Sequence, residues 1–314
     1  MTTMMTAATR AACPAALAAL LLLTGPLAAT GQDVQRIDET RTLSATGTVE
    51  VETLHHGVQI ERWDRAEVAV TGAYDADWEE FITEGDEQRL GLRIRPIRDR
   101  RGSWSPRRAE ELRVRIPEGA RVQVTTVSGA LRTTGGQGEV DLESMSGAIE
   151  MDGSPSRARL TSVSGAVTVR GRATDLRVQN VSGAIRIEAE APRVEVRTVS
   201  GSIQLRGQTA VSSAQMHSTS GRIDFEGALA HGAVLEAQSH SGTVTLTLSG
   251  DLDGDYRLSS FSGRLQADLP GAPTQGAERH RFSGQEQLTF TLGTGAGRIE
   301  ARSFSGNIQL RSGS

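Results

Sequence analysis

The sequence predicts an all-β fold, a single-stranded parallel β-solenoid (β-helix-like) with rungs of 18–22 residues and an N-terminal β cap. Three observations predict it. A Ser-Gly dipeptide recurs at a regular period, apolar residues alternate on both sides of each copy, and the 314 residues include 35 glycines and 9 prolines. Such a period is typical of a solenoid, and such a composition suits turns better than helices.

The Ser-Gly copies are interpreted as the corners of successive rungs. They are spaced by 18 residues over the first five copies and by 20–22 residues over the rest. The corners are Ser128-Gly129, Ser146-Gly147, Ser164-Gly165, Ser182-Gly183, Ser200-Gly201, Ser220-Gly221, Ser241-Gly242, Ser262-Gly263, Ser283-Gly284 and Ser305-Gly306.

Each rung has a common pattern, which the segment Val194 to Leu205 illustrates. Apolar residues take positions 1, 3, 6, 10 and 12, a small polar residue takes position 5, and Ser-Gly takes positions 7 and 8. This alternation predicts two short strands with one buried face. Its phase changes across Ser-Gly, where glycine permits a left-handed or strained corner.

Residues 1–30 are interpreted as a secretory signal peptide. One arginine, Arg10, precedes an apolar run from Ala15 to Leu23, and small residues follow. The run is too short to cross a bilayer, so we expect cleavage between Ala28 and Gln32. The mature protein would be periplasmic or extracellular, and any contact with the outer membrane would be peripheral. It would lack the chain's only cysteine, Cys13, and hence any disulfide.

Residues 31–120 are predicted to form an N-terminal β region and cap, and residues 121–314 the repeat domain. Gly57 is assigned to the corner of a divergent first rung. A loop between the cap strands is a candidate site for an anionic ligand, because arginine with an aromatic residue suits phosphate, anionic lipid or acidic polysaccharide. Its residues are Arg100, Arg101, Trp104, Arg107 and Arg108. The alternative is that the acidic segment 75–87 neutralises this loop within the cap.

The last rung ends at Leu310, and only Arg-Ser-Gly-Ser follows it. An open strand edge invites pairing. We therefore expect either end-to-end self-association or a fold-back cap formed by residues 270–295.

Several stretches carry the resemblance to a known family. They are the segment from Leu54 to Ile60, the segment from Arg113 to Gly119, the Val-Ser-Gly-Ala-Ile-type rungs, and the C-terminal run from Gly293 to Ile308. These features resemble the DUF4097 family of bacterial envelope proteins, which carries the label adhesin. The resemblance implies a β-solenoid and supplies no catalytic residue to carry over, since a fold alone does not fix a function.

No catalytic, cofactor or metal site is assigned from the residues. The corner serines form a repeated ladder in which no rung supplies a unique base. His217 and His240 fall at positions 4 and 6 of adjacent rungs, which we expect to face opposite ways. The segment Asp251 to Asp255 resembles a calcium loop but lacks its twelfth-position Glu.

The predicted function is therefore a non-enzymatic envelope module for binding, adhesion or scaffolding. Its partner would be an envelope protein, a polysaccharide or an anionic lipid; no nucleic acid is expected at a net charge of −4. The alternatives are a polysaccharide lyase or hydrolase on the same scaffold, and a structural or sensory part of an envelope-stress pathway. Clustered carboxylates on one face would favour the enzyme, an exposed aromatic or Arg groove would favour ligand binding, and a featureless Arg/Glu surface would favour the structural role.

Overall fold

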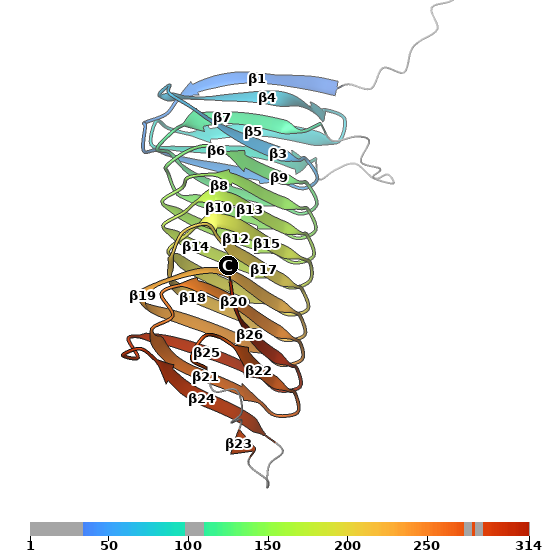
Figure 1. Ribbon diagram of the computed structural model, residues 1–314. Helices are drawn as coiled ribbons and strands as arrows, with labels where there is room; N and C mark the ends of the chain where they lie inside the picture. The colour runs from blue at the N-terminus through green and yellow to red at the C-terminus, as the bar shows by residue number, and fades with distance from the viewer. Residues whose placement is uncertain (1–33, 98–109, 273–277, 280–284, 314) are drawn as a thin grey trace, which may run out of the picture. The chain divides into compact units, whose positions relative to one another are not determined.

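Strands make up the regular structure of the computed structural model, which describes residues 34–97, 110–272, 278–279 and 285–313; no helix occurs among them. The strands join one extended, largely parallel sheet arranged as two stacked columns. Each rung gives one strand to each column, with the Ser-Gly corner between them (Figure 1).

The first column contains the strands that precede the corners. Its parallel strands follow one another in this spatial order: β6 (Arg89–Pro96), β2 (Thr48–Thr53), β8 (Arg121–Thr126), β10 (Val140–Ser144), β12 (Arg157–Ser162), β14 (Asp175–Asn180), β16 (Arg193–Thr198), β18 (Val211–Ser218), the second half of β19 (Ile223–Ser239), β25 (Gly297–Ser303) and β21 (Gly254–Ser260).

The second column contains the strands that follow the corners. Its parallel order is β7 (Leu112–Pro117), β3 (Val58–Trp63), β9 (Leu131–Thr134), β11 (Ile149–Gly153), β13 (Val167–Arg172), β15 (Ile185–Glu190), β17 (Ile203–Gly207), the first half of β19, β20 (Val244–Gly250), β26 (Ile308–Ser312) and β22 (Leu265–Asp268).

Equivalent residues lie directly above one another in both columns. Val140 pairs with Val122 on one side and with Ala158 on the other, each 18 residues away. Residues at positions 1, 3, 10 and 12 point between the columns and form one continuous aliphatic core. Stacking buries these columns of Val, Leu and Ile, which a single rung could not bury by itself.

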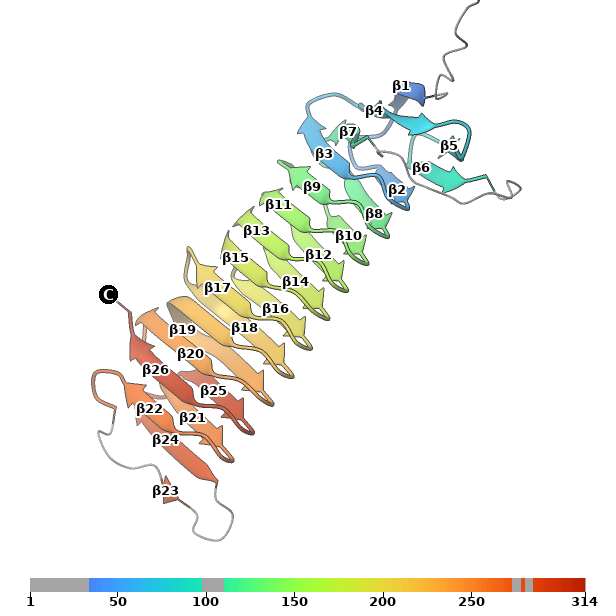
Figure 2. The same ribbon diagram turned by 90° about the vertical axis from the view of Figure 1, so that its right-hand side faces the viewer.

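The C-terminal end of the stack does not follow the order of the sequence. The last rung, β25 and β26, lies between the rung of β19 and β20 and the rung of β21 and β22 (Figure 2). The expectation of an uncapped final rung at Leu310 is therefore wrong, because that rung has a neighbour on each side. The spatially outermost rung is β21–β22, and β24 (Glu286–Leu292) folds back antiparallel along β21. This fold-back lies within residues 270–295, and the short β23 (Glu278–Arg279) pairs with β24.

The N-terminal end uses the same arrangement. The first rung, β2 and β3, is inserted between the rung of β8 and β9 and the strands β6 and β7. Antiparallel strands then close the end: β5 (Glu79–Gly85) pairs with β6, β4 (Glu67–Asp75) pairs with β7, and β1 (Val34–Thr42) pairs with β4. The rung of β2 and β3 and the rung of β25 and β26 are thus both inserted inside the stack, whereas β1 lies at its N-terminal edge (Figure 1).

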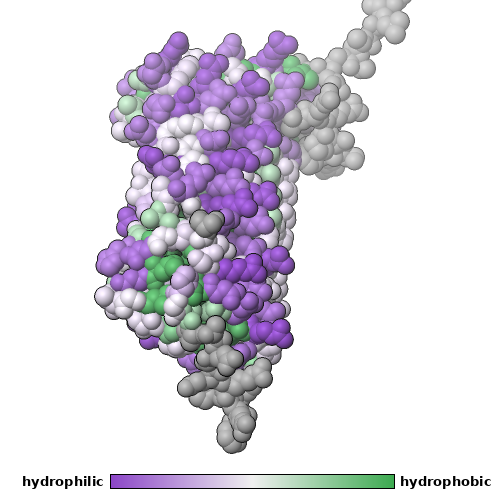
Figure 3. All heavy atoms as spheres, viewed as in Figure 1, coloured by the Kyte–Doolittle hydropathy of each residue, from purple (hydrophilic) through white to green (hydrophobic). Residues whose placement is uncertain are grey.

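The surface becomes less polar toward the C-terminal strands. From the side drawn in Figure 1, hydrophilic side chains dominate over the N-terminal and central strands, and the largest apolar area lies over the C-terminal strands (Figure 3). Among the described residues, no helix has the length and apolarity needed to cross a membrane.

Candidate functional site

A groove of about 880 Å³ runs beside the corners of seven rungs, and we call it the corner groove. It starts at the rung of β12 and ends at the rung of β21. Positions 4 and 6 of each rung form its two long rows of side chains. We call position 4 the donor row, which consists of Thr161, Gln179, Arg197, His217, Gln238, Arg302 and Ser259, and position 6 the outer row, which consists of Val163, Val181, Val199, Thr219, His240, Phe304 and Phe261.

The outer row is where the sequence pattern is misleading. Val163, Val181, Val199, Phe261 and Phe304 are 42–49% exposed, so the apolar residue at position 6 does not belong to the buried face. The row continues beyond the groove through Met145 and Val127, which are also exposed. Solvent therefore meets an unbroken apolar stripe along the N-terminal part of the row, a feature that marks binding surfaces when it is contiguous.

The side chain that is buried beside each corner is the small polar residue at position 5, not the apolar residue at position 6. These side chains form an inner ladder: Thr53, Thr126, Ser144, Ser162, Asn180, Thr198, Ser218, Ser239, Ser303 and Ser260. The Ser144 and Ser162 hydroxyls accept the N–H of the glycine three residues later at 2.8 and 3.0 Å. A buried N–H requires such an acceptor, and this requirement explains why the inward position is polar.

The corner glycines form a column in which backbones approach closely. A Cβ on Gly147 or Gly165 would lie less than 3 Å from the carbonyl oxygen of the preceding corner glycine, and the same holds for Gly183 to Gly263 along the stack. Only Gly183 among the described corners has a positive φ, of 145°. Of the two expected reasons for glycine, a left-handed or a strained corner, the left-handed one is thus wrong for the other described corners, where the close contact between rungs requires glycine.

The corner serines link neighbouring rungs. The N–H of Ser146 donates to the Val127 carbonyl at 2.9 Å, and its hydroxyl donates to the same oxygen at 3.0 Å. Ser164 makes the same pair of bonds to Met145, at 2.9 and 3.1 Å. Both bonds cross to the carbonyl of the exposed position-6 residue, so they hold the outer row in register.

The first corner contains a histidine where the later corners contain glycine. Thr53 pairs with Thr126, so His56 aligns with Gly129, and Gly57 aligns with Ala130. The assignment of Gly57 to the corner position is therefore wrong by one residue. His56 is 1% exposed, with Nδ1 3.0 Å from the Glu110 carbonyl oxygen and Nε2 3.0 Å from a Glu79 carboxylate oxygen.

Two acceptors at the two ring nitrogens favour the imidazolium form of His56. Burial alone would lower the pKa of His56, but the hydrogen bonds to Glu79 and to the Glu110 carbonyl raise it above its ordinary value. Burial likewise opposes ionisation of Glu79, and the bond to His56 outweighs burial, so the pKa of Glu79 is lowered. The pair closes the glycine column at its N-terminal end and ties β5 to the first corner.

Three stacked rings form the C-terminal end of the outer row. Phe304 lies between His240, with centroids 4.9 Å apart and planes at 5°, and Phe261, with centroids 4.8 Å apart and planes at 2°. The three ring residues directly follow β19, β25 and β21, and they are neighbours only because the last rung is inserted. Both faces of Phe304 are therefore covered, and its edge faces solvent.

The donor row combines charged and neutral donors without carboxylates. The lining includes Arg197, Arg302, His217 and His240, and it includes no Asp or Glu among the described residues. Arg197 pairs with Glu195 at 2.7 Å, and Arg302 pairs with Glu300; both acids lie at position 2, farther from the corner. His217 and His240 line the same groove, which corrects the expectation that positions 4 and 6 face opposite ways.

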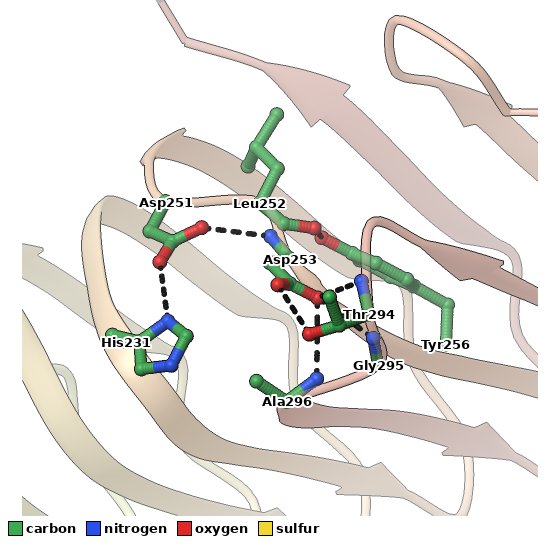
Figure 4. Close-up of polar contacts among 8 residues, drawn as sticks. All are labelled: His231, Asp251, Leu252, Asp253, Tyr256, Thr294, Gly295 and Ala296. Carbon is green, nitrogen blue, oxygen red and sulfur yellow. Dashed lines mark hydrogen bonds and ion pairs between the residues drawn. The ribbon is translucent and has the colours of Figure 1, made fainter.

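The carboxylates of the segment Asp251 to Asp255 bind protein groups (Figure 4). Asp253 accepts the N–H groups of Thr294, Gly295 and Ala296 at 2.7–3.2 Å and the Thr294 hydroxyl at 2.7 Å. Asp251 contacts His231 Nδ1 at 2.9 Å and accepts the N–H of Asp253. These bonds anchor the turn between β24 and β25, and no group of three potential ligands that could hold a metal occurs in the described ranges.

The remaining predicted features do not contribute to the described part of the corner groove. Arg100, Arg101, Trp104, Arg107 and Arg108 lie outside the described residues, as do Ser283-Gly284 and residues 1–30, for which a signal peptide is predicted. Acids of the 75–87 segment pair within the described cap, Glu80 with Arg95 at 2.7 Å and Glu84 with Arg93 at 3.3 Å. Among the dispersed acids of the rungs, Glu150 pairs with Arg132 and Glu226 pairs with Arg206 across neighbouring rungs.

Comparisons with known proteins identify a family and a set of distant structures. The model of a family described as Toastrack DUF4097 matches residues 48–311. No curated protein is significantly similar in sequence.

Three solved structures are similar at low identity. A candidate adhesin from Bacteroides fragilis has 9% identity and a TM-score of 0.39, with 88% of this chain and 97% of that chain covered. A candidate lipid-binding protein from Parabacteroides distasonis has 14% identity and a TM-score of 0.37, with 69% and 95% covered. A candidate cell adhesion protein from Clostridium sporogenes has 9% identity and a TM-score of 0.27, with 89% and 100% covered. Identities and scores this low indicate nothing about a shared ligand.

Proposed function

This chain belongs to the Toastrack DUF4097 family, and we propose that it is a non-enzymatic binding module that holds an elongated ligand in the corner groove. One observation carries the proposal: an exposed apolar stripe crosses several rungs and lies beside a row of hydrogen-bond donors. Ligand sites combine apolar walls with a few placed polar groups in this way.

The composition of the groove favours binding over catalysis. Hydrolysis or elimination on a polysaccharide needs carboxylates or another base held at the substrate. The described lining offers two arginines and two histidines but no carboxylate of its own, since Glu195 and Glu300, which contact the two arginines, lie outside it. A purely structural role would leave position 6 polar, because contact of valine and phenylalanine side chains with water does not stabilise the fold.

The proposal places the module in the cell envelope. The signal peptide predicted for residues 1–30 supports export. Leu21→Arg in the apolar run would keep the precursor in the cytoplasm, and cell fractionation would detect it there. End-to-end self-association is not part of the proposal, because β24 already covers the edge of β21.

The groove is tested with an apolar dye such as phenylnaphthylamine, whose fluorescence rises on leaving water. The wild-type protein is expected to enhance it, and a Val163→Ser/Val181→Ser/Val199→Ser variant is expected to lose most of the enhancement. Val234→Ser is the matched control, because Val234 is also exposed but does not line the groove. Equal enhancement by the triple variant and the wild type would contradict the proposal, provided that circular dichroism shows both proteins folded.

A further inference from the structure

We propose that the ligand of the corner groove is a single-chain amphiphile with a carboxylate head, an inference that rests on the proposed binding function. Its aliphatic chain lies along the valine part of the outer row. Its head lies in the polar middle of the groove, between Arg197 and Arg302.

The valine part of the outer row has the dimensions of one extended chain. Val199, Val181 and Val163 line the groove on three consecutive rungs, and the exposed Met145 and Val127 continue the stripe beyond it on the next two rungs. Rungs repeat at about 4.8 Å, so this stripe is about 19 Å long. Each rung contributes one apolar side chain to it, with the donor row on one flank, so it accommodates a single hydrocarbon chain rather than the broad surface of a bilayer.

The stripe ends where the polar residues begin. Thr219 and His240 replace the apolar residue on the next two rungs, and the donor row supplies His217 and Gln238 there. The next apolar residue in the outer row is Phe304. The groove therefore has a valine arm, a polar middle and an aromatic end, an order that matches the tail and head of an amphiphile.

The polar middle is bracketed by two guanidiniums. Arg197 lies one rung before His217, and Arg302 lies one rung after Gln238. The two arginines are thus three rungs or about 14 Å apart, so one carboxylate binds only one of the two forks directly. Glu195 contacts one nitrogen of Arg197, and Glu300 contacts one nitrogen of Arg302, so donors remain on each fork. Arginine forks match carboxylates in geometry and charge.

Charge complementarity favours an anionic head over a neutral or cationic one. The described lining itself has cations without anions, although the whole chain has a net charge of −4; Glu195 and Glu300, which contact its two arginines, lie at position 2 outside the lining. The central ring of the aromatic end, Phe304, offers no open face on which a sugar ring could stack. Both faces of Phe304 are occupied by His240 and Phe261.

The test is isothermal titration of the full mature chain with laurate, lauryl alcohol and laurylamine as monomers. Laurate is expected to bind about tenfold or more tightly than the alcohol, the scale of a charge-assisted hydrogen bond, and the amine more weakly than either. Palmitate is expected to bind more tightly than laurate, by up to about fourfold for each added CH₂.

Arg197→Gln/Arg302→Gln is expected to bind laurate only as well as the alcohol. Arg177→Gln is the matched control, since Arg177 lies at position 2 of a neighbouring rung, outside the lining, and pairs with Asp175 and Glu195. It is expected to keep the preference for laurate.

The outcomes separate this inference from the binding function. If the fluorescence enhancement of the dye depends on the valine stripe but laurate and lauryl alcohol bind equally, the inference of a carboxylate head is wrong and the binding function stands. A preference for laurate that survives the double arginine change also refutes the head position. Binding to vesicles of anionic phospholipid without binding of monomeric laurate refutes the single-chain ligand. If neither dye nor laurate depends on the stripe, the binding function itself fails.

Discussion

The inner ladder and the outer row lie one residue apart on the same corners, yet their polarity is the reverse of what burial usually requires. Ser162 is buried at 1% exposure, and its neighbour Val163 is 42% exposed. The buried hydroxyl is needed because the corner glycine presents an N–H to the interior. No such need explains the exposed valine, so the inner ladder is attributed to folding, and the role proposed for the outer row is binding.

The largest effect is expected for the glycine column that separates the two rows. In Gly165→Ala the new methyl group would lie less than 3 Å from the Gly147 carbonyl oxygen, so the rungs would have to part. We expect the free energy of unfolding to fall by more than about 3 kcal/mol, measured by chemical denaturation.

Gly91→Ala is the control for this change. A Cβ at Gly91 would meet only the Glu84 carbonyl oxygen, at 3.5 Å, an ordinary contact. It should change stability by no more than about 1 kcal/mol. Equal losses of stability in Gly165→Ala and Gly91→Ala would show that close approach between rungs is not the reason for glycine at the corner.

The inner ladder should show the next largest effect. Ser162→Ala leaves the Gly165 N–H without its acceptor in the interior. A buried unsatisfied N–H costs about 1–3 kcal/mol, and thermal or denaturant unfolding would measure the loss. Ser162→Thr keeps the hydroxyl and should restore most of the stability, since Thr198, two rungs along, accepts the Gly201 N–H in the same way. If Ser162→Thr is as unstable as Ser162→Ala, the hydroxyl does not have this role.

The first corner should make stability depend on pH. The folded pKa of His56 is raised above 6.5, so its contribution is present below pH 6.5 and is lost as the pH rises through the folded value. Glu79 has a lowered pKa, so its contribution is present above 4.5 and is lost as the pH falls through its folded value. Burial lowers the pKa of His55, which acts in the opposite sense to His56.

The measurement is therefore the difference in unfolding free energy between the wild-type protein and His56→Gln. This difference is expected to be largest between about pH 4.5 and 6.5 and to shrink above that window. A difference that stays constant from pH 5 to pH 9 would show that His56 is not held as the imidazolium.

The smallest effect on stability is expected for the outer row. Val181→Ser should change the free energy of unfolding by no more than about 0.5 kcal/mol, as is usual for surface positions. Val178 lies three residues earlier and is fully buried, so Val178→Ser should lower the free energy of unfolding several times more than Val181→Ser does. A comparable loss in both would mean that position 6 belongs to the core after all.

The sequence was sufficient to predict the corners and the two-strand rungs, because the period and the alternation are local patterns. It was misleading at position 6, since hydropathy places Val163 inside and Ser162 outside. What reverses them is the hydrogen bond of the Gly165 N–H, a backbone requirement that the hydropathy pattern does not contain.

The order of the rungs could not be predicted either. Rungs with the same pattern can stack on one another in any order, so nothing in β25 and β26 indicates that they lie between β19–β20 and β21–β22. The aromatic end of the groove depends on this insertion, since Phe304 contacts His240 and Phe261 only there. One signal was available: position 6 is aromatic in these three rungs and in none of the five regular rungs before Thr219.

Photo-crosslinking with a diazirine analogue of a fatty acid tests most directly whether the outer row is a binding surface. After irradiation of the protein, mass spectrometry of its digest would locate the adducts. The account predicts adducts concentrated on peptides that contain Val163, Val181 and Val199, and their loss when unlabelled laurate competes. Adducts concentrated on the 98–108 segment or on the outer turns, with the valine peptides unlabelled, would contradict it.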